Sequence, residues 1–203
     1  DIVSDLRTRV IPSDFSAGRM VHFLERSSEK GKGVLLVRIE PGTVSVISAR
    51  DQVLNGICHQ LEMNESVLEI ARGLSSQVTD PTSFATYIYN RNLFPDFTPA
   101  TLEDLGIEHA WARVRIREAL KALQQLDPGF GYSPDLGLTR AYEPIILSGP
   151  ELHLAAPHQG LMIALDGILP HGITTVLQDE QQLLTALGNL APHDPLLPVQ
   201  VID

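Results

Sequence analysis

Two segments in the first quarter of the chain have the hydrophobic pattern of β-strands. Residues 33–40 (GVLLVRIE) and 43–48 (TVSVIS) are rich in apolar and β-branched side chains, and Pro41-Gly42 separates them. Strand-like runs joined by a turn pair are typical of a β-hairpin, because Pro and Gly favour the backbone angles of a tight turn. We therefore predict an N-terminal β-hairpin.

Apolar residues spaced three and four apart then predict a helical middle from about residue 50 to residue 126. The first predicted helix carries such a stripe at Leu54, Ile57, Cys58 and Leu61. Another helix begins at Asp80-Pro81, with proline at the first helical position. The longest predicted helix spans residues 107–126.

The last third of the chain returns to short apolar runs that predict β-strands. These runs are residues 142–147, 152–156, 160–165 and 172–177, and a helix over 179–187 follows them. A hairpin, then helices, then strands is the element order of an α+β domain. We predict one α+β domain over residues 1–203, with C-terminal antiparallel strands packed on the helices.

Charge narrows the range of partners. The chain has 25 acidic and 15 basic residues, a formal net charge of −10. A negative field repels nucleic-acid phosphates and anionic membranes, and no apolar run approaches the ~18 residues of a membrane span. We expect a protein substrate or partner, no nucleic acid and no membrane span.

Cys58 is the only cysteine, so the chain cannot form an internal disulfide. This composition suits the cytoplasm, or delivery into a reducing cytosol. The N-terminus, Asp1-Ile2-Val3, has no starting Met and no signal-peptide pattern. We therefore expect a domain that belongs to a larger protein.

Two interpretations of Cys58 stay open. If Asn55 caps the predicted helix, Cys58 lies in its first turn, where the helix dipole favours a nucleophilic thiolate. If the helix begins earlier, near Ser48, Cys58 is a small buried side chain beside Leu54. His59 cannot serve as its base, because neighbouring helix residues point about 100° apart. A base must come from elsewhere in the chain.

The segment Gly56-Ile57-Cys58-His59-Gln60-Leu61 resembles the Gly-x-Cys-x-x-Leu start of the nucleophile helix in papain-like cysteine proteases of bacterial effectors and toxins. His153 and Asp166 follow in the order of that family's histidine and aspartate, with His158 an equally defensible histidine. The resemblance implies a thiol-dependent acyl-transfer enzyme, a protease or deamidase. Cys58 would attack, His153 would carry the proton and Asp166 would orient the imidazole. It implies no cofactor.

The alternative is a non-catalytic protein-interaction module of a larger multidomain protein. Two features could bind the partner: the basic stripe Arg113, Arg117 and Lys121 on the long helix, and Phe130 and Tyr132 in a glycine-rich loop. The aromatic pair could equally anchor the loop to the core. The histidines of the C-terminal half match no tight metal motif, so we predict no metal site.

Overall fold

The computed structural model describes residues 12–27, 31–73, 80–94, 97–140, 142–153, 157–194, 198 and 200–201. In chain order the elements are α2 (Ser13–Ser27), β1 (Gly33–Glu40), β2 (Thr43–Arg50), β3 (Val53–Gln60), α3 (Glu65–Gly73), α4 (Pro81–Leu93), α5 (Leu102–Leu126), β4 (Tyr132–Ser133), β5 (Gly137–Leu138), β6 (Tyr142–Ser148), the short 3₁₀ helix η1 (Pro150–His153), α6 (Pro157–Ile168), β7 (Val176–Asp179) and α7 (Leu183–Leu190). This mixture confirms the predicted α+β class.

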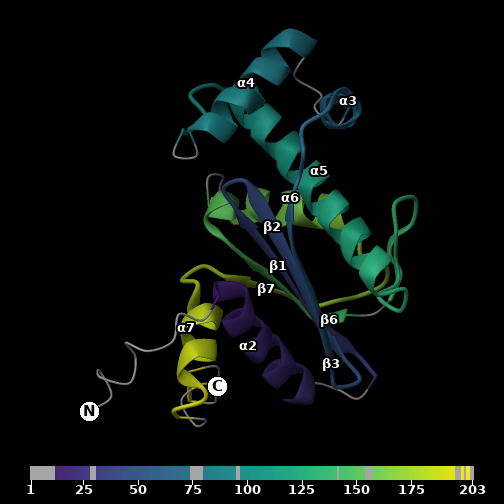
Figure 1. Ribbon diagram of the computed structural model, residues 1–203, viewed down its shortest axis with the longest axis vertical. Helices are drawn as coiled ribbons and strands as arrows, with labels where there is room; N and C mark the ends of the chain where they lie inside the picture. The colour runs from purple at the N-terminus through teal and green to yellow at the C-terminus, as the bar shows by residue number, and fades with distance from the viewer. Residues whose placement is uncertain are drawn as a thin grey trace.

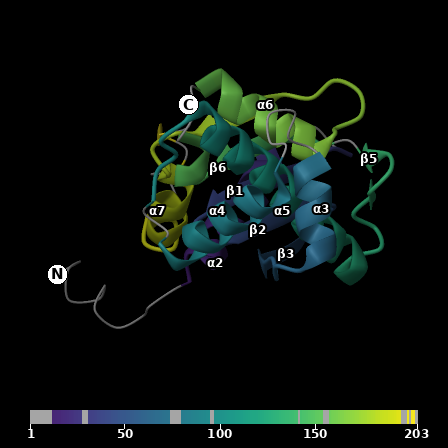
Figure 2. The same cartoon turned by 90° about the horizontal axis from the view of Figure 1, so that it is seen from above.

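A five-stranded sheet in the order β3-β2-β1-β6-β7 forms the centre of the molecule. Strands β1, β2 and β3 form an antiparallel meander, whereas β6 pairs in parallel with β1, and β7 in parallel with β6. Seen from above, β3, β2, β1 and β6 follow one another across the sheet (Figure 2). The predicted hairpin is confirmed, but the prediction of antiparallel C-terminal strands is wrong. Helix α6 intervenes between β6 and β7, which allows a crossover to a parallel strand.

Helices cover both faces of the sheet (Figure 1). Because successive strand residues point to opposite faces, β1 supplies two cores in alternation. Leu35, Val37 and Ile39 pack under α5 and α6, while Val34 and Leu36 pack against α2 and α7. A strand buried on both faces reads as a continuous apolar run, which explains why residues 33–40 were easy to predict.

A separate group of helices extends beyond the sheet (Figure 1). Helices α3 and α4 pack against the first half of α5 around their own core, centred on Phe84, Ile88, Trp111 and Val114. We call the described residues between 61 and 114 the helical lobe. Asp80 accepts hydrogen bonds from the first N–H groups of α4, as expected for an N-cap before a helix-starting proline.

Three segments differ in type from their predictions. Residues 53–60 form a strand where a helix was predicted, and residues 157–168 form helix α6 where a strand over 160–165 was predicted. Residues 150–153 form η1 at the start of the strand predicted for 152–156, and 154–156 lie outside the described residues. Among the helices described, none combines the length and apolar character needed to cross a membrane.

Candidate functional site

Strand β3 forms one edge of the sheet and is positioned by a two-residue turn. Asp51 and Gln52 have φ angles of 50° and 65°, and Arg50 pairs with Val53 on either side of them. Two successive residues with positive φ form a type I′ turn, whose twist matches that of hairpin strands. The register between β2 and β3 then runs without a bulge to Thr43 and Gln60.

This register determines which backbone groups of β3 point away from β2. The two residues that flank such a turn exchange hydrogen bonds, and the pairs beyond them alternate between bonded and non-bonded. Counted from Arg50–Val53, the odd-numbered residues of β3 bond to β2. The N–H and C=O groups that face the free edge therefore belong to Leu54, Gly56, Cys58 and Gln60.

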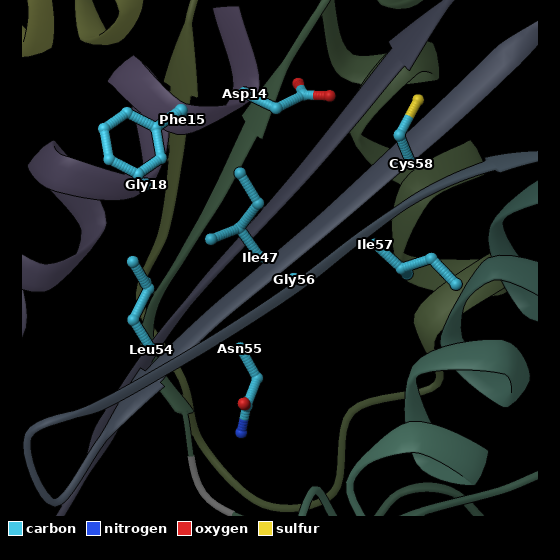
Figure 3. Close-up of a pocket in the computed structure, with 9 residues that line it drawn as sticks. All are labelled: Asp14, Phe15, Gly18, Ile47, Leu54, Asn55, Gly56, Ile57 and Cys58. Carbon is cyan, nitrogen blue, oxygen red and sulfur yellow. The ribbon is translucent and has the colours of Figure 1, made fainter. Parts of the chain in front are cut away.

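A groove of about 290 Å³ lies between this edge and α2 (Figure 3). Helix α2 contributes Asp14, Phe15 and Gly18, and β2 contributes Ile47. Strand β3 lines the groove with residues 54–58. In the close-up, Ile57 points away toward α5, where it packs against the core on that face of the sheet. The groove therefore belongs to the α2 face.

Two glycines keep the groove open. A Cβ on Gly56 would lie 3.3 Å from Cγ1 of Ile47, and a Cβ on Gly18 would lie 3.4 Å from Cδ2 of Leu54. Because neither side chain is present, the surface between α2 and β3 stays hollow. Its rim is apolar: Phe15 is 56% exposed and Leu54 is 38% exposed. These two exposed side chains flank a groove that a ligand side chain could enter.

Polar contacts hold the α2 wall in place. Asp14 accepts a hydrogen bond from Oγ of Ser45 at 2.9 Å and lies 3.6 Å from the guanidinium of Arg38. The guanidinium of Arg19 lies 4.8 Å from the ring centre of Phe15, a cation–π contact. These contacts tie α2 to the sheet and orient Phe15 at the groove.

The structure places Cys58 on β3, with an exposed side chain. Both interpretations based on a helix are therefore wrong: Cys58 occupies neither the first turn of a helix nor a helical core. The apolar spacing at Leu54, Ile57 and Leu61 is coincidental, because in a strand Leu54 and Ile57 point to opposite faces of the sheet.

The other two residues of the predicted triad lie on separate elements. Asp166 lies on α6, where its Oδ2 is 3.0 Å from Nη2 of Arg113 and its backbone carbonyl accepts a hydrogen bond from Arg117 at 2.9 Å. Helix α6 is in the layer of α5, whereas Cys58 lines the groove on the α2 side (Figures 1 and 3). His153 is the last residue of η1. Cys58 and Asp166 are thus on opposite sides of the sheet.

The basic stripe on α5 is engaged within the chain. Arg113 and Arg117 both bind Asp166, and Lys121 lies 3.4 Å from the carboxylate of Glu118. The contacts of Arg113 and Arg117 tie α5 to α6, whereas Lys121 and Glu118 both lie on α5. A partner-binding role for the stripe stays a prediction.

Phe130 and Tyr132 take the second of their two predicted roles and anchor the loop. Phe130 is fully buried and Tyr132 is 6% exposed, both in the core beneath α5. The Phe130 ring lies 5.5 Å from that of Tyr142, whose hydroxyl donates to the Phe130 carbonyl. Burial raises the pKa of Tyr142 to about 12.

Histidines do not gather with acidic or cysteine side chains in the part of the chain that the structure describes. No three such residues there come close enough to hold a metal ion. His158 and His171 are exposed.

Among the comparisons with known proteins, only the one with solved structures finds matches. No family model matches the chain, and no curated protein does. The activator of 2-hydroxyisocaproyl-CoA dehydratase from Clostridium difficile with bound ADPNP is 14% identical, with 95% of this chain and 70% of that one covered and a TM-score of 0.43. A PilM–PilN type IV pilus biogenesis complex gives 15% identity, 97% and 53% coverage and a TM-score of 0.42. An archaeal actin homolog is 14% identical, with 88% of this chain and 53% of that one covered and a TM-score of 0.41.

The prediction of a papain-like cysteine protease, and with it a thiol-dependent effector enzyme, is wrong. This chain spans between about half and 70% of the lengths of the three structures named above. The helix that should carry the nucleophile is strand β3, and the predicted orienting aspartate lies on the other side of the sheet. The segment from Gly56 to Leu61 matches the protease motif in letters but not in conformation.

Proposed function

We propose that this domain binds another protein by accepting an extended segment of it as an additional strand beside β3. Side chains of that segment would enter the groove between β3 and α2. The observation that carries the proposal is an eight-residue strand at the edge of the described sheet, whose outward backbone groups pair with no other described strand, next to an open apolar groove. Strand addition uses both features, because main-chain hydrogen bonds supply affinity and pockets for alternate side chains supply specificity.

The composition of β3 supports this role. Natural edge strands are usually protected against pairing by lysine, proline, a bulge or short length. The β3 sequence VLNGICHQ contains no charged residue and no proline, its register has no bulge, and it is eight residues long. No other strand in the described part of the chain pairs with its outer edge. Such an edge is suited to pairing with another chain.

Charge favours a different protein over a second copy of this one. In an antiparallel pair of two β3 strands, Asp51 at one end would lie near Glu62 at the end of the other copy. Each copy also carries a net charge of −10, and like charges oppose association. The partner segment therefore has apolar residues at alternate positions and basic residues at its ends.

A peptide library displayed on phage tests the proposal. Selection against the whole chain should enrich peptides with alternating apolar residues and flanking Lys or Arg. A selected peptide should lose at least about tenfold in affinity when alternate backbone nitrogens are methylated, and little when the intervening ones are. Equal sensitivity at both sets of nitrogens would show that the peptide does not bind as a strand.

Two matched variants locate the binding site. Leu54→Lys puts a charge on the β3 edge, whereas Leu177→Lys puts the same charge on β7, at the opposite edge of the sheet. Both leucines are partly exposed, so both variants should fold. We expect Leu54→Lys alone to weaken binding by about tenfold. Equal binding by the two variants would place the site elsewhere.

A further inference from the structure

A second exposed apolar surface lies where α4 ends and α5 begins, away from the groove proposed above. Tyr89, Leu93, Phe94, Phe97 and Leu102 form this junction patch, with exposed fractions of 52%, 72%, 64%, 42% and 78%. Tyr89 and Leu93 are one helical turn apart and therefore neighbours on α4. Phe97 donates its backbone N–H to the carbonyl of Phe94 at 2.9 Å. Apolar side chains that cluster in this way mark an interaction surface.

The junction patch is held by well-formed structure. The Phe97 ring packs edge-on against Tyr87, with centroids 5.6 Å apart. Thr101 and Asp104 form a capping box at the start of α5: the Thr101 side chain accepts from the Asp104 N–H, and the Asp104 side chain accepts from the Thr101 N–H. These contacts hold Phe97 and the first turn of α5 in place, which limits the entropy lost when a partner binds there.

A buried ion network fixes α4 to α5 beneath the patch. Nε of Arg91 lies 2.8 Å from Oε1 of Glu108, and the Tyr87 hydroxyl donates to the same oxygen at 3.1 Å. Glu151 then joins Arg91 to Arg115, which itself binds backbone carbonyls at the β1–β2 turn. The network connects the helical lobe to the sheet.

The helical lobe is strongly acidic. Residues 61–114 contain eight acidic and three basic residues, so about a quarter of the chain carries five of its ten net negative charges. Glu103 is exposed next to Leu102. The other acidic residues are spread over the lobe, and Glu108 is buried against Arg91. An exposed carboxylate such as that of Glu103 beside an apolar patch favours a ligand that combines apolar residues with the opposite charge. A second copy and an anionic membrane would both be repelled.

We propose that the junction patch binds a basic amphipathic helix of a partner protein. The apolar stripe of that helix would cover the patch, and its Lys and Arg residues would face the acidic lobe. Helices meet by packing ridges into grooves, and the pair Tyr89 and Leu93 forms such a ridge on α4. No described strand lies in the lobe, so strand addition is not available there.

Titration with a synthetic helix of about 14 lysines and leucines in amphipathic order tests this proposal. Emission from Trp111, the only tryptophan and part of the lobe core, reports binding. We expect saturable binding that weakens between about 50 and about 300 mM salt. A peptide of the same composition in scrambled order, and one with Glu in place of Lys, should each bind at least about tenfold more weakly.

Variants assign the binding to the patch. Leu93→Ser with Leu102→Ser should weaken it about tenfold, and Ile173→Ser, which alters a 98% exposed side chain outside the lobe, should leave it unchanged. Unchanged binding by the double variant, or equal binding of the scrambled peptide, would overturn the proposal. Sedimentation of the chain with phosphatidylserine vesicles, lost in the double variant, would also overturn it, because the patch would then be a membrane surface.

Discussion

Proline substitution along β3 provides the strictest test of the free edge. The register makes the Cys58 N–H point outward and the His59 N–H point to the carbonyl of Val44. Proline removes the N–H of the residue that it replaces. Cys58→Pro should therefore keep the β2–β3 ladder, whereas His59→Pro should break one of its hydrogen bonds.

The size of the difference follows from burial. Val44 is 1% exposed, so its carbonyl would lose its partner in a place that water reaches poorly. An unsatisfied buried backbone group costs about 1–3 kcal/mol. Both prolines also restrict φ in a strand, and this cost is similar at neighbouring positions. We expect His59→Pro to be less stable than Cys58→Pro by about 1–3 kcal/mol.

Urea unfolding followed by circular dichroism measures this difference. Cys58→Ala and His59→Ala serve as controls, because subtracting their effects removes the contribution of each lost side chain. Cys58→Pro should also weaken the selected strand peptide, since it deletes an outward donor while the fold persists. If the two prolines cost the same after correction, the register assigned to β3 or its free edge is wrong.

Two further predictions concern the core and the lobe. Burial raises the pKa of Glu108 above its ordinary value of 4.5, so the native state keeps this proton to higher pH than the unfolded chain does. The ionisation of Glu108 therefore lowers the free energy of unfolding as pH rises from about 4.5. Glu108→Gln should gain stability relative to the wild type across that rise, and parallel curves of unfolding free energy against pH between about pH 4 and pH 7 would contradict this. Gly188→Ala would place a Cβ 1.8 Å from the Ser16 carbonyl oxygen and should cost about 3 kcal/mol or more in thermal unfolding, whereas Gly73→Ala, with nothing within 4 Å, should be neutral or stabilising.

The sequence predicts the elements whose pattern is set by burial on both faces or by strong turn and cap residues. The β1–β2 hairpin, the start of α4 at Pro81 and most of α5 were all predicted correctly. Each has a local cause in the chain, either a continuous apolar run or a capping residue.

Strand β3 was missed because its local signals are ambiguous. As an edge strand it alternates between exposed and partly buried residues, and its few apolar side chains happen to have helical spacing. The turn before it has Asp51 and Gln52 at positive φ. An Asn-Gly pair at these two positions would have predicted a hairpin. Its conformation is set by pairing with β2, a contact that a local pattern does not show. Helix α6 was missed for the converse reason, since an apolar run such as residues 161–165 fits a buried strand as well as a buried helix.

The groove could not be predicted even with every helix and strand correctly assigned, because it is open only where two glycines lack side chains. Gly18 and Gly56 are 38 positions apart in the chain, and each alone reads as a weak point in its helix or strand. Only the packing of α2 across β2 and β3 makes the two glycines border one hollow, between Ile47 and Leu54. The free edge depends on the fold in the same way. Whether a strand keeps unpaired N–H and C=O groups is decided by which strand ends the sheet, which is a property of the strand order and not of the strand.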